Sequence, residues 1–289
     1  MKKRNPSVYV GLRGGLGNQL FSMSAGFIAA KLSKSCLILD GRQAHNKNNL
    51  NFNQCELSQF DLSSIEIQLK GLLTDLNLNR YERNYYRVKV ALSNRFVFGK
   101  SLTTNKTSNL YQDIIKRHPN LLVSHYENTD LPYSALQLGF PFILKPKTMR
   151  DRYLEMHHQM QSITTVAIHV RLGDFLVWQG GKYLTSPKFY AQALSDIQSK
   201  LDSQKKTQYF LFSDDPVLAS NLLPTHLRFR NISAERNLNS AEEMLLMSQC
   251  DFIVSSKSTF SWWACFWKGN SGNIYSPHDG WRYPEWKLS

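Results

Sequence analysis

Three side chains that can take part in chemistry, His169, Arg171 and Asp174, lie within six residues of one another. His169 lies within the apolar run 166–170, and Arg171 and Asp174 follow that run. The alternating residues of the run fit a buried β-strand. The alternation puts His169 and Arg171 on the same side of that strand. Because an unpaired guanidinium is costly to bury, we expect Arg171 to reach an anion at the carboxyl end of the strand, where open α/β sheets bind ligands. The same spacing also fits a structural Arg171–Asp174 ion pair beside a core histidine.

Two further clusters of polar residues follow apolar runs in the second half of the chain. Asp214 and Asp215 come after the strand-like segment 209–212, and the hydroxyl-rich turn 255–261 precedes a helix-like segment. The hydroxyl groups of main interest in that turn belong to Ser258, Thr259 and Ser261. Strand ends that meet at one edge of a sheet predict a single crevice containing these residues and Arg171. Carboxylates there could accept hydrogen bonds from a ribose or a base edge, while hydroxyls and helix N–H groups could hold phosphate oxygens.

Adjacent aspartates can also indicate a metal site. The chain contains no Asp-x-Asp sequence, and no obvious histidine or glutamate partner lies near Asp214 and Asp215. A hard cation such as magnesium needs more oxygen ligands than this pair supplies. We therefore interpret the pair as nucleotide recognition and expect no metal and no other cofactor.

A glycine-rich loop lies near the start of the chain, between a strand-like segment at 7–12 and a helix-like segment at 19–34. Its residues of interest are Gly14, Gly15, Gly17, Asn18 and Gln19. Three glycines in four positions suit a close approach of the backbone to a ligand, and the following helix offers free N–H groups to an anion. Tight packing explains the glycines equally well. With a second strand at 36–40, the segment predicts a β-loop-α-β unit.

The two halves of the chain differ in regularity. From about residue 41 to residue 120 the pattern is weak, and a crossing toward the second half is marked by Pro132, Pro141 and Pro146. A helix is expected near 148–160. We place a domain boundary at about residue 150, which gives domains of 1–150 and 151–289.

Two helices of the second half carry recognisable start signals. Ser186 and Pro187 should cap and start a helix that runs to about residue 201. The sequence Ser-Ala-Glu-Glu at 240–243 predicts a capping box for the helix 241–249, with a strand following at 251–254.

Composition limits the partners and the compartment. A formal net charge of +13 on 289 residues implies an anionic partner, which could be a phosphorylated substrate, an anionic membrane surface or nucleic acid. No nucleic-acid-binding motif is present, so we expect no nucleic acid. No apolar stretch reaches the roughly 18 residues of a membrane span, and we expect no signal peptide. Four scattered cysteines indicate buried thiols in a reducing cytosol.

Four motifs resemble, in order, those of the α-1,2-fucosyltransferases of glycosyltransferase family 11. They are Gly-Gly-Leu-Gly-Asn-Gln at 14–19, His-Val-Arg-Leu-Gly-Asp at 169–174, Phe-Ser-Asp-Asp at 212–215 and Ser-Thr-Phe-Ser-Trp-Trp-Ala at 258–264. One such motif would be a weak signal, whereas four in order are specific. The resemblance covers nearly the whole chain apart from about residues 41 to 120.

The resemblance implies an α/β GT-B fold, in which two Rossmann-like domains face each other across a donor and acceptor cleft. The N-terminal domain would lie on the acceptor side, and the C-terminal domain would hold most of the donor, GDP-β-L-fucose. By that similarity Arg171 binds the β-phosphate and stabilises the departing GDP, while His169 and one of Asp214 and Asp215 hold the guanosine. The phosphates would be lined by Ser258, Thr259, Phe260 and Ser261. The glycine loop, with Asn18, would close over the donor.

The implied reaction is a metal-independent transfer that inverts the anomeric centre, with His169, Arg171 and Asp174 as the catalytic candidates. Loss of GDP develops negative charge on the β-phosphate, so a fixed cation helps most in the transition state. Asp174 is the candidate base for the acceptor hydroxyl, and Glu127 is the second candidate. The family motif commonly has a second arginine where this chain has Leu172. The absence of that arginine could weaken the affinity for the donor or indicate a different sugar. By alternation Leu172 also points away from Arg171, which fits a packing role.

The resemblance points to the 2-hydroxyl of a terminal β-galactoside as acceptor. We expect a cytoplasmic enzyme, peripheral at the inner face of the membrane, that acts on a lipid-linked oligosaccharide in the synthesis of a surface polysaccharide such as O-antigen. Two alternatives stay open. One is a transferase of the same fold that uses another nucleotide sugar, and the other is a basic glycan-binding or nucleic-acid-binding protein without catalysis.

Overall fold

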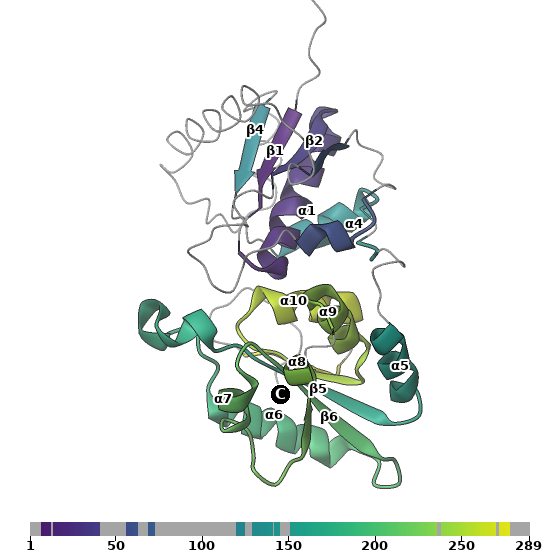
Figure 1. The fold of residues 1–289 in the computed structure, drawn as a ribbon, viewed down its shortest axis with the longest axis vertical. Helices are drawn as coiled ribbons and strands as arrows, with labels where there is room; N and C mark the ends of the chain where they lie inside the picture. Colours follow the sequence, from purple (N-terminus) through teal and green to yellow (C-terminus); the bar gives the residue numbers. More distant parts are fainter. Residues whose placement is uncertain are drawn as a thin grey trace, which may run out of the picture. The chain divides into compact units, whose positions relative to one another are not determined.

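The computed structural model describes residues 7–12, 14–40, 56–62, 69–72, 120–124, 129–140, 142–144, 151–235, 238–269 and 272–277. The chain divides into two compact units, Met1–Ile143 and Leu144–Ser289. Each unit is built on a parallel β-sheet flanked by helices (Figure 1).

The first unit contains a four-stranded parallel sheet in the order β3-β2-β1-β4. Its strands are β1 (Ser7–Gly11), β2 (Cys36–Asp40), β3 (Leu69–Leu72) and β4 (Asn120–Ser124). Its helices are α1 (Leu16–Ser33), the short 3₁₀ helix η2 (Glu56–Gln59) and α4 (Asp130–Gln137). This strand order is that of one half of a doubly wound nucleotide-binding fold. The predicted β-loop-α-β unit is therefore β1-α1-β2.

Helix α1 is buried along most of its length, because small residues bring it close to its neighbours. Gly26 lies against Val10 of β1, so closely that a β-carbon at position 26 would overlap the Val10 side chain. Phe27 meets Phe140, which follows α4, edge to face with the ring centroids 4.9 Å apart. The helix is thus held on one side by the sheet and on another by the α4 segment.

The second unit contains a five-stranded parallel sheet in the order β7-β6-β5-β8-β9. Its strands are β5 (Thr164–Val170), β6 (Thr207–Ser213), β7 (Phe229–Asn231), β8 (Phe252–Val254) and β9 (Ile274–Tyr275). Counted from β5, this is again the doubly wound order 3-2-1-4-5, with the winding direction reversing between β5 and β8. The strand that ends at Val170 is therefore the central one and pairs with β6 and β8.

Helices cover both faces of this second sheet (Figure 1). Helix α6 (Pro187–Lys200) packs against the face that carries Val166, Ile168 and Val170 of β5. Helices α9 (Ser240–Gln249) and α10 (Thr259–Lys268) lie on the opposite face. The remaining helical segments are α5 (Asp151–Met160), η4 (Gly173–Leu176), η5 (Trp178–Gly181), α7 (Pro216–Ser220) and α8 (Ile232–Glu235).

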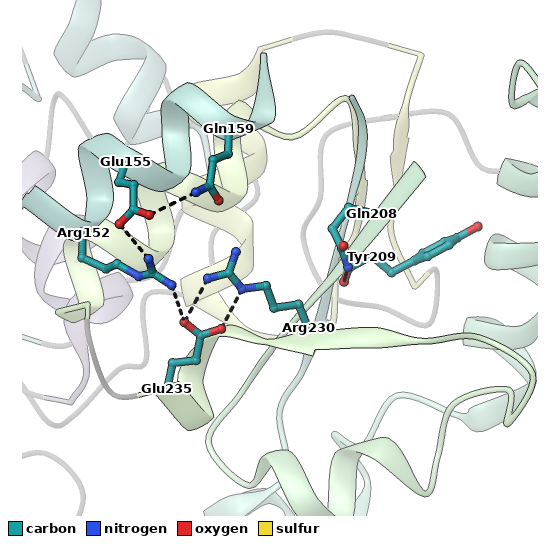
Figure 2. A network of polar contacts seen from close by, with 7 residues as sticks. All are labelled: Arg152, Glu155, Gln159, Gln208, Tyr209, Arg230 and Glu235. Carbon is teal, nitrogen blue, oxygen red and sulfur yellow. Dashed lines mark hydrogen bonds and ion pairs between the residues drawn. The ribbon is translucent and has the colours of Figure 1, made fainter. Parts of the chain in front are cut away.

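A network of charged side chains joins α5 to β7 and α8 (Figure 2). Arg152 of α5 contacts Glu155 at 2.7 Å and Glu235 at 3.3 Å. Arg230 of β7 reaches the same Glu235 carboxylate from the other side, with 2.7 Å between Nε and Oε1. The hydrogen bonds from Arg230 lower the pKa of Glu235. Two guanidiniums thus share one carboxylate and fix α5 at the edge of the unit.

The structure corrects three expectations about helix starts. Helix α1 begins at Leu16 rather than Gln19, so part of the glycine loop is the first turn of the helix. The capping box of α9 is formed by Asn239 and Glu242, one residue earlier than predicted, because asparagine is as good a cap as serine. Pro132 lies in the first turn of α4, where its missing N–H is not needed. Ser186 caps α6 as predicted, by accepting a hydrogen bond from the N–H of Phe189.

Candidate active site

The functional candidates of the second unit lie at or just after the carboxyl ends of β5, β6 and β8. In the register of the sheet, Val170 pairs with Ser213 of β6, and Ile168 pairs with Val254 of β8. The residues after β5 and after β8 therefore flank the point at which the winding of the sheet reverses, which is where ligands bind in doubly wound folds.

His169 is buried at this point and is held by its neighbours. Its Nδ1 shares a 2.7 Å hydrogen bond with the Ser256 hydroxyl, and its ring stacks on Phe260 with the centroids 5.4 Å apart. Burial, reinforced by the charge of Arg171, lowers the pKa of His169 to about 3. The ring is therefore neutral near pH 7, and it can act there as a hydrogen-bonding group but not as a cation.

Arg171 lies between two carboxylates at the end of β5. Its Nη2 contacts Asp174 Oδ1 at 2.5 Å, and its Nη1 contacts Asp214 Oδ2 at 2.9 Å. The guanidinium also lies over the Phe175 ring, with 5.5 Å between its central carbon and the ring centroid. Its side chain is only 17% exposed, whereas that of Asp174 is 50% exposed. The Arg171–Asp174 ion pair is thus present, and Asp214 is a second, less exposed partner of the guanidinium.

Asp214 and Asp215 have different local roles despite being adjacent. Asp214 Oδ1 accepts a hydrogen bond from the N–H of Leu172 at 2.9 Å, so this carboxylate binds both the side chain and the backbone of the segment after β5. Asp215 is the N-cap of α7 and accepts a hydrogen bond from the N–H of Leu218 at 3.0 Å.

The side chain of Leu172 is buried in the core on the α6 side of the sheet. This agrees with the packing role that alternation along the strand suggested for it.

The hydroxyl-rich turn after β8 forms the start of helix α10. Ser258 is the N-cap and accepts a hydrogen bond from the N–H of Phe260, while Thr259 is the first residue of the helix. The Ser261 hydroxyl is buried and donates to the carbonyl of Ser256 at 3.2 Å. Helix N-terminal N–H groups thus lie beside the strand end predicted to bind phosphate, while part of the hydroxyl set supports the turn itself.

Ser256 is a further residue of the candidate site that the sequence motifs do not indicate. Ser256 belongs to the hydroxyl-rich turn, and its position two residues after β8 is the available signal. Its hydroxyl bonds to His169, and the neighbouring Lys257 is buried, with its Nζ donating to the carbonyl of Lys182 at 3.4 Å. Ser256 therefore connects the segment after β8 to the end of β5.

The glycine loop lies in the first unit, after β1. Gly14 has φ of +68°, a left-handed conformation that favours glycine, and a β-carbon there would come within 2.7 Å of the Asn18 amide. Gly15 is the N-cap of α1, and Gly17 is buried in its first turn. The Gln19 amide is used inside the unit, because Nε2 donates to the carbonyl of Gly14 at 2.9 Å and Oε1 accepts from the N–H of Glu56 at 3.1 Å.

The contacts form two sets at the end of β5. Arg171 contacts Asp174 and Asp214, whereas His169 contacts Ser256 and Phe260. The charge of Arg171, two residues further along the chain, contributes to the lowered pKa of His169. Glu127, the second candidate base, lies outside the described residues. Among the residues that the structure describes, no three His, Cys, Asp or Glu side chains cluster as metal ligands would. No helix in the described part of the chain has the length and apolar character that crossing a membrane requires.

Residues 143–278 match the sequence model of glycosyl transferase family 11. The O-antigen biosynthesis glycosyltransferase WbnK of Escherichia coli is 25% identical over 280 residues, which cover 90% of this chain and 89% of WbnK. The match to the family model lies almost entirely in the second unit, whereas the similarity to WbnK spans both units.

Solved fucosyltransferases have a similar fold. The structure of NodZ from Bradyrhizobium matches with a TM-score of 0.54 at 15% identity, covering 91% of this chain and 93% of NodZ. A mutant of Arabidopsis thaliana FUT1 in complex with GDP matches with a TM-score of 0.51 at 17% identity, covering 96% of this chain and 72% of FUT1. The family model and WbnK confirm the resemblance to glycosyltransferase family 11 and identify the chain as a glycosyltransferase. The solved structures confirm the α/β GT-B fold class.

Proposed function

With the resemblance to glycosyltransferase family 11 confirmed, we propose that this protein transfers L-fucose from GDP-β-L-fucose to a hydroxyl group of a glycan. The observation that carries the proposal is the placement of Arg171 directly after the central strand β5, whose neighbour in the sheet, β8, is followed by the N-terminus of α10. That position suits a diphosphate, because it combines a fixed cation with helix N–H groups. NodZ, which has a similar fold, has been soaked with GDP-fucose in its crystals.

Arg171 would act on the leaving group. As the bond between fucose and the β-phosphate breaks, negative charge grows on the phosphate oxygens, and a guanidinium already held in place stabilises that charge without reorganising. The two carboxylates and the Phe175 ring around Arg171 limit its motion before the donor arrives. A positioned group of this kind typically contributes about 3 to 4 kcal/mol to the transition state.

His169, Ser256 and Phe260 would define the place of the guanosine. A histidine that is neutral near pH 7 can donate or accept one hydrogen bond to a nucleoside without adding charge. The Ser256 hydroxyl and the Phe260 ring fix its orientation from two directions. Ser258, Thr259 and the first N–H groups of α10 would contact the phosphates.

Asp174 is our candidate for the base that accepts the proton of the acceptor hydroxyl. It is the more exposed of the two carboxylates on Arg171, so an incoming acceptor could reach it. The hydroxyl oxygen would bond to the anomeric carbon on the face opposite GDP while the bond to the β-phosphate breaks. A β-linked donor would then give an α-linked product, and the released GDP would retain the bonding electron pair.

The second part of the proposal concerns the acceptor and the cellular compartment. We propose the 2-hydroxyl of a terminal β-galactoside, in a lipid-linked unit of a surface polysaccharide that is completed at the cytoplasmic face of the membrane. The name of WbnK, an O-antigen biosynthesis glycosyltransferase, supports the polysaccharide class. The net charge of +13 is suited to contact with an anionic membrane surface.

The test is a donor panel followed by an acceptor screen. Purified protein is incubated with GDP-fucose, GDP-mannose and UDP-sugars, and released nucleotide is measured with and without β-galactosides. Among the donors, we expect only GDP-fucose to release its nucleotide. The NMR spectrum of the product should show fucose α-linked to O2 of galactose. Turnover of another nucleotide sugar would identify a transferase with a different donor. Absence of turnover and of GDP binding would contradict the enzyme assignment.

A further inference from the structure

We propose that Asp214 is a positioning residue for Arg171 and not a ligand of the nucleoside. The inference rests on the proposed function, in which Arg171 contacts the donor's β-phosphate. It assigns the two adjacent aspartates separate tasks, because Asp215 caps helix α7 while Asp214 binds the segment after β5.

Both carboxylate oxygens of Asp214 have partners in the residues that follow β5. Oδ2 is 2.9 Å from Nη1 of Arg171, and Oδ1 accepts the N–H of Leu172 at 2.9 Å. The side chain is 20% exposed, so these contacts are screened less than those of Asp174, which is 50% exposed. Asp214 therefore holds the Arg171 guanidinium with one carboxylate oxygen and the backbone after β5 with the other.

Gly173 provides a second, independent observation. Its backbone is not in the left-handed region, so conformation does not demand a glycine there. A β-carbon at position 173 would instead overlap Oδ2 of Asp214. The absence of a side chain at position 173 therefore leaves room for the carboxylate that pairs with Arg171.

The support from Asp214 is important because the residue that directly follows Arg171 carries no charge. The next residue along the chain, Leu172, is a buried core residue and offers only its backbone N–H, which Asp214 accepts. An arginine side chain has several rotatable bonds, and holding it in one geometry before the donor binds reduces the entropy lost in the reaction. Asp214 thus carries out within this chain the bracing that a neighbouring charged group could otherwise supply.

The decisive variant is Asp214→Asn. Asparagine keeps the shape and can still accept the Leu172 N–H through its oxygen, but it loses the ion pair with Arg171. Calorimetric titration with GDP and with GMP separates the two roles, since only GDP carries the β-phosphate. We expect the affinity for GDP to fall about tenfold while the affinity for GMP changes less than about twofold. Equal losses for GDP and GMP would overturn the inference and make Asp214 a nucleoside ligand, and unchanged affinity for both would overturn it as well.

The matched control is Glu235→Gln, which removes another arginine-paired carboxylate of the same unit (Figure 2). It should lower thermal stability but leave both affinities and kcat within about twofold. Gly173→Ala provides a second variant that acts on the same contact. Its loss of GDP affinity and that of Asp214→Asn should not add in the double variant, because both weaken the same ion pair between Asp214 and Arg171. Additive losses would mean that the two residues act separately.

Failure of the inference and failure of the proposed function give different results. If wild-type protein binds neither GDP nor GMP, the nucleotide assignment itself is wrong. If the wild type binds GDP more tightly than GMP and Asp214→Asn keeps that full difference, only the positioning role is refuted.

Discussion

Replacing Arg171 with alanine is the most direct perturbation of the proposed mechanism. The change removes the cation between Asp174 and Asp214 without altering the strand that precedes it. We expect kcat to fall roughly 100- to 1000-fold, which corresponds to the 3 to 4 kcal/mol typical of a lost transition-state donor.

The cost in stability should be smaller than the cost in activity. Asp174 is half exposed, so water can solvate its carboxylate after the substitution. Asp214 is 20% exposed and keeps the Leu172 N–H as a partner, so it loses one of two contacts rather than both. A partly buried group that loses one partner costs about 1 to 3 kcal/mol, and the lower end applies here because one hydrogen bond remains.

The assay combines GDP release under steady-state conditions with thermal unfolding of the same sample. Arg152→Ala is the matched control, because it removes another guanidinium shared between two carboxylates (Figure 2). It should lower the unfolding temperature without a comparable loss of kcat. A folded Arg171→Ala protein that keeps more than about a tenth of wild-type kcat would refute the argument from charge stabilisation.

Four further outcomes can be measured. The pKa of His169 is lowered to about 3 in the folded protein, so the unfolded state takes up a proton first and the contribution of His169 to stability is lost as the pH falls from about 6.5 toward 3. A His169→Asn variant should therefore lose less stability than wild type over that pH range, and equal losses of stability would contradict this. Asn239→Ala removes the capping side chain of α9 and should cost about 1 kcal/mol in urea unfolding, with kcat unchanged. Gly26→Ala overpacks α1 against Val10 and should lower the free energy of unfolding by about 1 to 3 kcal/mol. The same substitution should lower it less in a protein that also carries Val10→Ala, and additive losses of stability in the double variant would exclude the steric cause. Because Arg171 supplies the positive charge, turnover should persist in EDTA, and loss of activity that magnesium or manganese restores would show that a metal is needed.

The central elements of the second unit could be predicted because their signals are local. The apolar run of β5 and the Ser186-Pro187 start of α6 follow from neighbouring residues alone. Strands β7 and β9 could not be found in the same way, since they have three and two residues and show no measurable alternation. They form because the edges of the sheet supply partners, which is information from distant parts of the chain.

The residue types of the candidate site can be read from the sequence, but the contacts that each residue makes cannot. Adjacent aspartates look alike in a sequence, and only the fold shows that Asp215 caps a helix whereas Asp214 turns back to Arg171. The part of Ser256 in holding His169 likewise depends on the register between β5 and β8. Spacing along the chain indicated both a ligand-binding arginine and a structural ion pair for Arg171. The contacts show that the ion pair is present, and the proposed ligand role depends on the same guanidinium.

The central place of β5 has a consequence for how activity should be lost on heating. Its backbone hydrogen-bonds to strands on both sides, so its amides are expected to exchange with deuterium only when the whole unit opens. The guanidinium attached to its end then keeps its surroundings until the unit melts. Heat inactivation should accordingly be abrupt and coincide with the unfolding of residues 164–170, with little gradual decline beforehand.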